Sequence, residues 1–164
     1  MAAADGVDRI VEQWAEQRPE LDTAAMAIFG RVFRLARLVG DEMERIYGEF
    51  GIGRPEFDVL ATLRRSGPPY ELSAGALSAS MMISTGGTTA RLDRLEKAGL
   101  VKRRPDPNDR RGVVVGLTPR GRALVDKAVT AGLERQQQLL VHLPPTKQRQ
   151  LSALLRELVA PLEP

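Results

Sequence analysis

Residues 99–121 read GLVKRRPDPNDRRGVVVGLTPRG, and this stretch decides the fold. Its two runs VKRR (101–104) and VVVGL (113–117) predict short β-strands. The PDPNDRR segment that joins them is rich in turn residues and is too long for a two-residue hairpin loop. The sequence therefore predicts a β-hairpin with a long, charged tip.

Two short helices are predicted immediately before this hairpin. One lies around residues 73–80, and the other covers 84–98, with Ser84 or Thr85 at its N-cap and a glycine at its end. Two short helices joined by a tight turn form a helix-turn-helix, and a hairpin that follows directly is a wing. We therefore expect a mainly α-helical chain with a small β-hairpin wing, that is, a winged helix-turn-helix.

Longer amphipathic helices are predicted on both sides of this unit. On the N-terminal side, apolar residues at helical spacing indicate one helix that Pro19 stops, a long one that ends near Gly51, and a third that starts at Pro55. On the C-terminal side they indicate a long helix over about 119–141 and a final one that carries the leucines of 151–158. A length of 164 residues and a hydrophobic share of 43% fit a single globular domain, 1–164.

The composition argues against an enzyme. The chain has no cysteine and one histidine, His142, so neither a thiol nucleophile nor a histidine-based metal cluster or catalytic triad can be built. No glycine-rich phosphate-binding motif is present, and the carboxylates are too scattered for a metal-dependent nuclease. We expect no catalytic residues, no metal and no cofactor. The acidic N-terminus and the lack of a long apolar run predict a cytoplasmic protein without membrane contact.

The charges are distributed unevenly along the chain. Residues 84–122 carry 10 Lys and Arg against 4 Asp and Glu, whereas residues 1–60 carry 7 against 12. A basic segment inside a nearly neutral chain is typical of a surface that binds phosphates, although charge alone also fits a solvated basic face. Because this segment contains the helix-turn-helix and the wing, double-stranded DNA is the expected partner.

The motif at 99–121 resembles the wing signature of the MarR family of transcription regulators, with Asp109-Arg110-Arg111 at its D-x-R position. The preceding TTARLDRLEKAGLV (88–101) is similar to that family's recognition helix. The resemblance implies a homodimer in which 7–50 and 119–162 are mainly dimerisation helices and 54–117 is the DNA-binding region. Two-fold symmetry then implies a pseudo-palindromic operator. Repression is the usual outcome in this family.

The predicted DNA contacts come from the recognition helix and the wing. The N-terminal residues of the helix are expected at base edges or phosphates, and the wing arginines in the minor groove, with Arg111 ahead of Arg110. Arg94 reaches either DNA or a surface ion pair with Glu96 or Asp93. The full set is Ser84, Thr85, Gly87, Thr89, Arg94, Arg110 and Arg111. Further phosphate contacts are expected from Lys102, Arg103, Arg104 and Arg120.

A ligand site is suggested by Arg91, which falls on the inward face of the recognition helix, where a charge needs a partner. Asp58 is a candidate for that partner. The chain also resembles the urate-responsive (HucR/PecS-like) branch of the MarR family, whose pocket matches Trp14, Asp58, Arg91 and Arg103. This implies a regulator released by urate or another small aromatic anion. The alternatives are a structural Asp58–Arg91 pair with a different effector or none, or an architectural winged-helix module.

Overall fold

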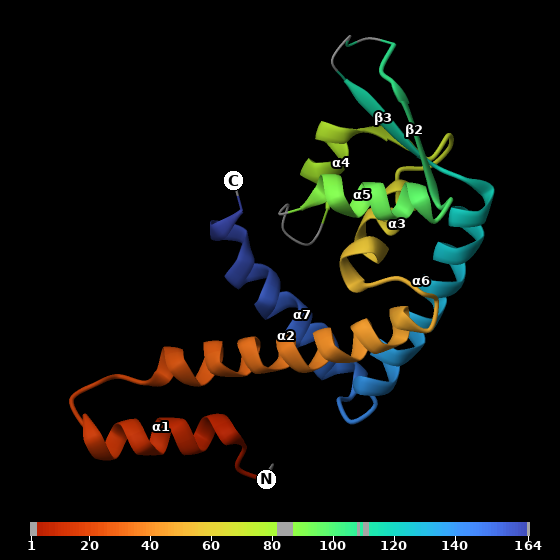
Figure 1. The fold of residues 1–164 in the computed structure, drawn as a ribbon. Helices are drawn as coiled ribbons and strands as arrows, with labels where there is room; N and C mark the ends of the chain where they lie inside the picture. Colours follow the sequence, from red (N-terminus) through yellow and green to blue (C-terminus); the bar gives the residue numbers. More distant parts are fainter. Residues whose placement is uncertain (1–2, 82–86, 108, 110–111, 164) are drawn as a thin grey trace.

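The computed structural model describes residues 3–81, 87–107, 109 and 112–163. Helices make up most of it, and a small antiparallel sheet lies at one end (Figure 1). The helices are α1 (Gly6–Gln17), α2 (Ala24–Gly48), α3 (Arg54–Arg65), α4 (Ala74–Ser80), α5 (Thr88–Lys97), α6 (Pro119–Leu139) and α7 (Pro145–Val159), with a closing 3-10 turn, η1 (Ala160–Leu162). The strands are β1 (Glu71–Ser73), β2 (Val101–Pro105) and β3 (Val113–Leu117).

The wing is a three-stranded sheet in the order β1-β3-β2. Strands β2 and β3 pair antiparallel, with Val101 opposite Leu117 at one end and Pro105 opposite Val113 at the other. This confirms the predicted hairpin. Strand β1 pairs with the other edge of β3 and was not predicted, because three residues are too few to show an alternating pattern.

Side-chain caps set where two of the helices begin. The hydroxyl of Ser73 accepts from the backbone N–H of Ala76 at the start of α4, and that of Thr118 accepts from Gly121 at the start of α6. The recognition helix α5 begins at Thr88, later than the predicted start at residue 84. Gly87 precedes it with a φ of 77°, a left-handed conformation that suits glycine. The predicted caps Ser84 and Thr85 lie outside the described residues.

The core lies inside the winged-helix unit. Leu60 and Leu63 of α3 are fully buried, and they belong to one apolar cluster with Leu77 of α4, Leu95 of α5 and Val115 of β3. Helix α3 is therefore the central element, and it packs against α4, α5 and α6. The start of α6 lies so close to the wing that a Cβ at Gly121 would stand 1.9 Å from the Leu100 carbonyl oxygen.

The long helices extend away from this core (Figure 1). Helix α1 packs on α2, α2 crosses α6, and α7 contains no buried residue. Most of the exposed large apolar side chains lie on these helices. Among the described residues, no helix is long and apolar enough to cross a membrane.

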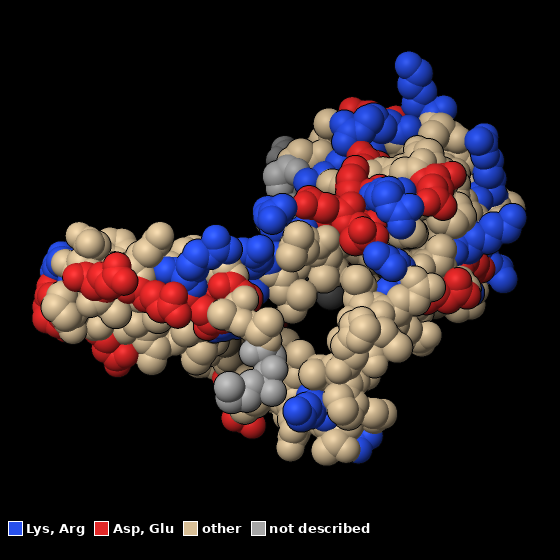
Figure 2. Space-filling model, turned by 90° about the horizontal axis from the view of Figure 1, so that it is seen from below, with Lys and Arg blue, Asp and Glu red and all other residues tan. Residues whose placement is uncertain are grey.

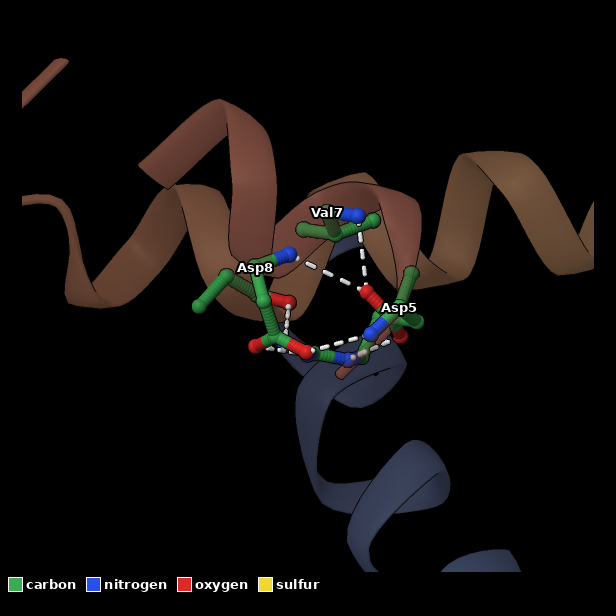
Figure 3. A network of polar contacts seen from close by, with 5 residues as sticks. Asp5, Val7 and Asp8 are labelled. Carbon is green, nitrogen blue, oxygen red and sulfur yellow. Dashed lines mark hydrogen bonds and ion pairs between the residues drawn. The ribbon is translucent and has the colours of Figure 1, made fainter. Parts of the chain in front are cut away.

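Polar contacts fix the first turn of α1 against α2. The Asp5 carboxylate accepts from the backbone N–H groups of Val7 and Asp8, and the Asp8 carboxylate accepts from the N–H of Asp5 (Figure 3). Arg31 of α2 pairs with both carboxylates, at 2.9 Å to Asp5 and 2.5 Å to Asp8. Backbone hydrogen bonds, together with Arg31, lower the pKa of both carboxyl groups. These contacts set the position of the helix that carries Trp14.

Candidate nucleic-acid interface and effector cleft

The recognition helix α5 has one buried face and one exposed face. Leu92 and Leu95 are buried in the winged-helix core, and Thr88 and Arg91 are half-buried beside them. The opposite face is exposed, as predicted, and consists of Thr89, Ala90, Asp93, Arg94 and Lys97. The structure therefore leaves Thr89 and Arg94 accessible to DNA, together with Gly87 just before the helix.

Arg94 forms an ion pair that differs from the predicted ones. Its guanidinium donates from Nε to Glu56 Oε1 of α3 at 2.9 Å, and Nη2 contacts the same oxygen. The expected partners were Glu96 and Asp93, and this expectation was wrong because it considered only neighbours on the same helix. The Glu56 side chain is 13% exposed and that of Arg94 is 61% exposed. Arg94 thus links the recognition helix to the start of α3 while most of its own surface faces solvent.

Arg103 links the wing to the recognition helix. Its Nη2 lies 2.5 Å from Asp93 Oδ1, and its Nε lies 3.5 Å from Glu96 Oε2. The backbone N–H of Arg103 also donates to Glu96, at 3.1 Å. Two carboxylates of α5 therefore surround this guanidinium, so that strand β2 and helix α5 are held together.

Glu71 plays a similar part at the base of the wing. Its carboxylate lies 2.7 Å from Arg104 Nη2 and 3.2 Å from Lys102 Nζ. Hydrogen bonds from Arg104 first, and then from Lys102, lower the pKa of Glu71 below its ordinary value of 4.5. Both cations remain about half exposed or more, so they stay accessible to phosphates. Arg110 and Arg111, the predicted minor-groove contacts, lie outside the described residues.

Charged side chains of both signs lie on the surface. Figure 2 shows Asp and Glu side chains along the arm that α1 and α2 form, with Lys and Arg side chains beside them, and Lys and Arg side chains around the winged-helix end, with several Asp and Glu side chains among them. The sequence itself is acidic over 1–60 and basic over 84–122. The excess of positive charge in the segment that holds the recognition helix and the wing attracts the DNA backbone.

An open cleft of about 830 Å³ lies between α2, α3 and α6. The rings of Tyr47 and Phe57 stack in its wall, with centroids 3.8 Å apart and planes tilted by only 10°. Burial raises the pKa of the Tyr47 hydroxyl above its ordinary value. The lining residues are Tyr47, Phe57, Asp58, Ala61, Arg64, Arg65, Asp126, Val129, Thr130, Leu133 and Gln136.

Two arginines at the end of α3 bring positive charge to this cleft. Arg64 pairs with Asp126 of α6, with 2.7 Å between Nε and Oδ1, and its guanidinium also lies over the Tyr70 ring. Arg65 donates to the Thr62 hydroxyl at 3.2 Å and to the carbonyl of Ser80. The cleft thus combines apolar and aromatic walls with two arginines and with the carboxylates of Asp58 and Asp126. Arg64 is paired with Asp126, whereas the hydrogen bonds of Arg65 go to neutral groups.

Of the four predicted ligand residues, only Asp58 lines this cleft. It is 6% exposed, and both Asp58 and Arg91 have interaction partners within the structure. Trp14 is 41% exposed on α1, a helix whose main packing partner is α2, and Arg103 is held by carboxylates of α5. Within one chain the structure therefore does not gather Trp14, Arg91 and Arg103 around the cleft.

Sequence reasoning missed most of the cleft residues. A usable signal was present on α3, because Ala61 and Arg65 follow Asp58 at spacings of three and seven and so share its helix face. Phe57 directly precedes Asp58 on the same helix, whereas Tyr47 belongs to α2, so only the fold brings Tyr47 to the cleft. In the part of the chain that the structure describes, no cluster of His, Asp or Glu has the composition of a metal site.

The fold and this interface define a class of protein, the winged helix-turn-helix DNA-binding regulators. A sequence model described as "MarR family" matches residues 50–112. The chain is 37% identical to the transcriptional regulator PecS of Dickeya dadantii over 149 residues, which are 91% of this chain and 90% of PecS. It therefore belongs to the MarR family of DNA-binding transcriptional regulators, which are not enzymes.

Two solved structures extend the comparison. Sco3205, a MarR family regulator from Streptomyces coelicolor solved in complex with DNA, superimposes with a TM-score of 0.77 at 23% identity, covering 88% of this chain and 91% of that chain. BpsR of Bordetella bronchiseptica, whose DNA binding is regulated by 6-hydroxynicotinic acid, superimposes with a TM-score of 0.63 at 28% identity. The superposition covers 78% of this chain and 98% of that chain. The first similarity confirms the mainly helical winged-helix fold.

Proposed function

We propose that two copies of this chain form a sequence-specific repressor that a small aromatic anion such as urate releases from its operator. One observation carries the proposal. Helix α3 forms a wall of the aromatic, arginine-bearing cleft, and the recognition helix packs against the same helix. A ligand in the cleft can therefore change the position of the element that contacts DNA.

The proposed DNA contacts follow from exposure and charge. The N-terminal part of α5, with Gly87 and Thr89, faces the major groove, and Arg94 extends the contact toward guanine or phosphate. The wing residues Arg110 and Arg111 are assigned to the adjacent minor groove. Lys102 and Arg104, exposed at the base of the wing, supply phosphate contacts that give affinity without sequence information.

The proposed homodimer follows from the apolar surface of the long helices, 7–50 and 119–162. Phe33 is 70% exposed on α2, and Leu154 of α7 is 62% exposed. Many more large apolar side chains are exposed on the same helices, more than a soluble monomer normally leaves in contact with water. A second copy related by two-fold symmetry covers such faces in both chains at once, and it matches a pseudo-palindromic operator.

The class of effector follows from the chemistry of the cleft. Stacked aromatic rings favour a flat ligand, and Arg65, which donates to the Thr62 hydroxyl and the Ser80 carbonyl, favours an anion. The regulation of BpsR by 6-hydroxynicotinic acid, a planar aromatic acid, supports this class for a relative of similar fold. Urate is the effector that we propose. Asp58 lines the cleft, whereas Trp14, Arg91 and Arg103, which the resemblance assigns to a urate site, do not line it within one chain. A ligand shifts the equilibrium only if it binds one arrangement more tightly than the other.

Fluorescence anisotropy on DNA from upstream of the gene tests the proposal. At fixed salt we expect tight binding that urate relieves, and 6-hydroxynicotinate serves as the second probe. The single tryptophan, Trp14, tests the site that the resemblance implies, because a urate molecule bound beside it would quench its fluorescence. Calorimetry with Arg91→Ala tests the assigned site, and we expect weaker urate binding. Tight DNA binding that neither anion changes would contradict the proposed effector response. The proposal that the chain is a DNA-binding regulator would stand.

A further inference from the structure

Arg65 connects the cleft with the helix-turn-helix. It belongs to the last turn of α3, and it lines the cleft together with Asp58 and the aromatic pair. Its guanidinium nitrogen Nη2 donates to the carbonyl of Ser80, the last residue of α4. The same nitrogen donates to the hydroxyl of Thr62, which is itself buried. One side chain therefore contacts both the proposed ligand site and the end of the first helix of the helix-turn-helix.

We propose that Arg65 is the positioning residue that couples the cleft to DNA binding, and that an anion in the cleft competes with the Ser80 carbonyl for its guanidinium. This inference rests on the proposed function, because it needs an anionic effector in the cleft. It adds a residue outside the set Trp14, Asp58, Arg91 and Arg103. It also names the hydrogen bond through which a ligand in the cleft changes the position of α4.

The competition has a clear direction. A hydrogen bond from a guanidinium to a carboxylate or another anion is roughly twice as strong as one between neutral groups, and a backbone carbonyl carries no net charge. An anion near Arg65 therefore draws the guanidinium toward the cleft and weakens its bond to Ser80. The last carbonyls of a helix have no partner within that helix, so the end of α4 is then less well satisfied.

A change at the end of α4 reaches the recognition helix through α3 and along the chain. Helix α4 ends at Ser80 and α5 begins at Thr88, so seven residues of sequence separate the two helices. Both helices pack against α3, which carries Arg65. With the Ser80 hydrogen bond formed, α4 and α5 are held in the arrangement that fits DNA. Without it the same arrangement is less populated, so the affinity for the operator falls.

Arg64 provides a matched control. It is the neighbouring arginine, it lines the same cleft, and it carries the same charge. Its guanidinium, however, pairs with Asp126 of α6 and stacks on Tyr70, and neither partner belongs to α4 or α5. Removing Arg64 therefore removes a positive charge from the cleft and leaves the hydrogen bond to Ser80 in place.

The test compares Arg65→Ala and Arg64→Ala in the full chain, by anisotropy on the operator with and without urate or 6-hydroxynicotinate. Circular dichroism checks that both variants fold. Without an effector we expect Arg65→Ala to bind the operator about tenfold more weakly, while Arg64→Ala changes affinity less than about threefold. At saturating effector, wild type and Arg64→Ala both lose affinity for DNA, with Arg64→Ala needing a higher effector concentration because it lacks one cleft arginine, whereas Arg65→Ala loses little more, because its coupling is already broken.

The effector response separates coupling from a merely structural role. A residue that only stabilises the fold lowers DNA affinity when it is replaced but leaves the fold-change caused by the effector intact. Replacing a residue that binds a DNA phosphate lowers the slope of log K against log salt by about 0.9, whereas we expect Arg65→Ala to keep the wild-type slope. Equal DNA affinity of wild type and Arg65→Ala, an unchanged effector response in that variant, or a reduced slope would each overturn the inference.

The wild-type arm distinguishes this inference from the proposed function. If neither anion changes operator binding by the wild type, the effector part of the proposed function fails and the competition in the cleft fails with it. The contribution of the Arg65–Ser80 hydrogen bond to DNA binding is then tested only by comparing the operator affinities of wild type and Arg65→Ala without an effector. If the wild type responds and Arg65→Ala responds equally, the proposed function stands and the assignment of Arg65 is wrong.

Discussion

The winged-helix unit and the long helices use their apolar residues in different ways. In the winged unit the large apolar side chains point inward, and α3 contributes leucines that are completely buried. On the long helices they remain largely exposed, with Phe33 of α2 and Leu154 of α7 as clear cases. One half of the molecule therefore completes its core within a single chain, whereas the other half leaves a comparable set of residues uncovered.

This difference distinguishes the folding stability of a single chain from the stability of a dimer. The winged unit is stabilised by contacts within one chain, and removing apolar surface from water contributes about 25 cal/mol per Å². The long helices gain the same contribution only when a partner covers them. We therefore expect substitutions in the winged unit to change folding free energy, and substitutions on the exposed faces to change association.

Phe33→Asp is expected to give the largest effect, because it places a charge on the apolar face of α2. A central aromatic residue contributes roughly 2 kcal/mol or more to an interface, and a two-fold interface contains it twice. We expect the dimer dissociation constant to rise about 1000-fold in sedimentation equilibrium. Arg37→Ala, which removes an exposed ion pair with Asp41 on the same helix, serves as the control and should leave association nearly unchanged.

Leu60→Ala tests the opposite region. Leu60 is fully buried in the winged unit, so truncation leaves a cavity and should lower the free energy of unfolding by about 3 kcal/mol. Urea denaturation measures this change. Leu154→Ala, on the exposed face of α7, removes the same atoms and should act on association instead. If Leu60→Ala and Leu154→Ala lost the same folding free energy at a concentration where both variants are monomeric, the proposed difference between the two regions would be wrong.

Glu56→Gln sharpens the account of the DNA-binding face. The substitution removes the charge that holds Arg94 and leaves the arginine free to contact phosphate. We expect affinity for nonspecific DNA to rise about threefold, and the slope of log K against log salt to steepen by about 0.9 for each subunit. Asp41→Asn, far from the recognition helix, is the control. An unchanged slope would show that Arg94 does not reach the DNA backbone.

Glu71→Gln should give the smallest effect, and its sign depends on pH. The folded pKa of Glu71 is lowered by Arg104 and Lys102, so the ionised form stabilises the fold at pH values above the ordinary 4.5 and this contribution is lost as pH falls. We expect the variant to melt roughly 2 °C lower than wild type at pH 7, and the difference to shrink as the pH falls below 4.5 through the lowered folded pKa. Thermal melts by circular dichroism over a series of pH values measure it.

Much of the fold could be predicted because its signals are local. The turn residues between the two wing strands and the helical spacing of the leucines are each visible within a short stretch of chain. The start of α5 was misplaced, because Ser84 and Thr85 resemble caps and Gly87 was not interpreted as the residue before the helix. Strand β1 is defined by pairing with β3, a contact between segments more than 40 residues apart.

The candidate sites were harder to predict because they depend on contacts across the fold. Arg94 was given partners on its own helix, but its carboxylate, Glu56, comes from α3. Asp58 was singled out from the sequence and lines the cleft, where Arg64 and Arg65, which were not expected at a ligand site, also belong to the lining. The local pattern does not show which side chains of different helices the fold brings to one cleft.

Sedimentation equilibrium of the full chain tests the central claim most directly, namely that the exposed helices belong to a second copy. The account predicts twice the chain mass of 18.0 kDa, maintained to low micromolar concentration, with the Phe33→Asp variant dissociated under the same conditions. A wild-type chain that sediments at 18.0 kDa across the whole concentration range, while it binds DNA as tightly as before, would contradict the account.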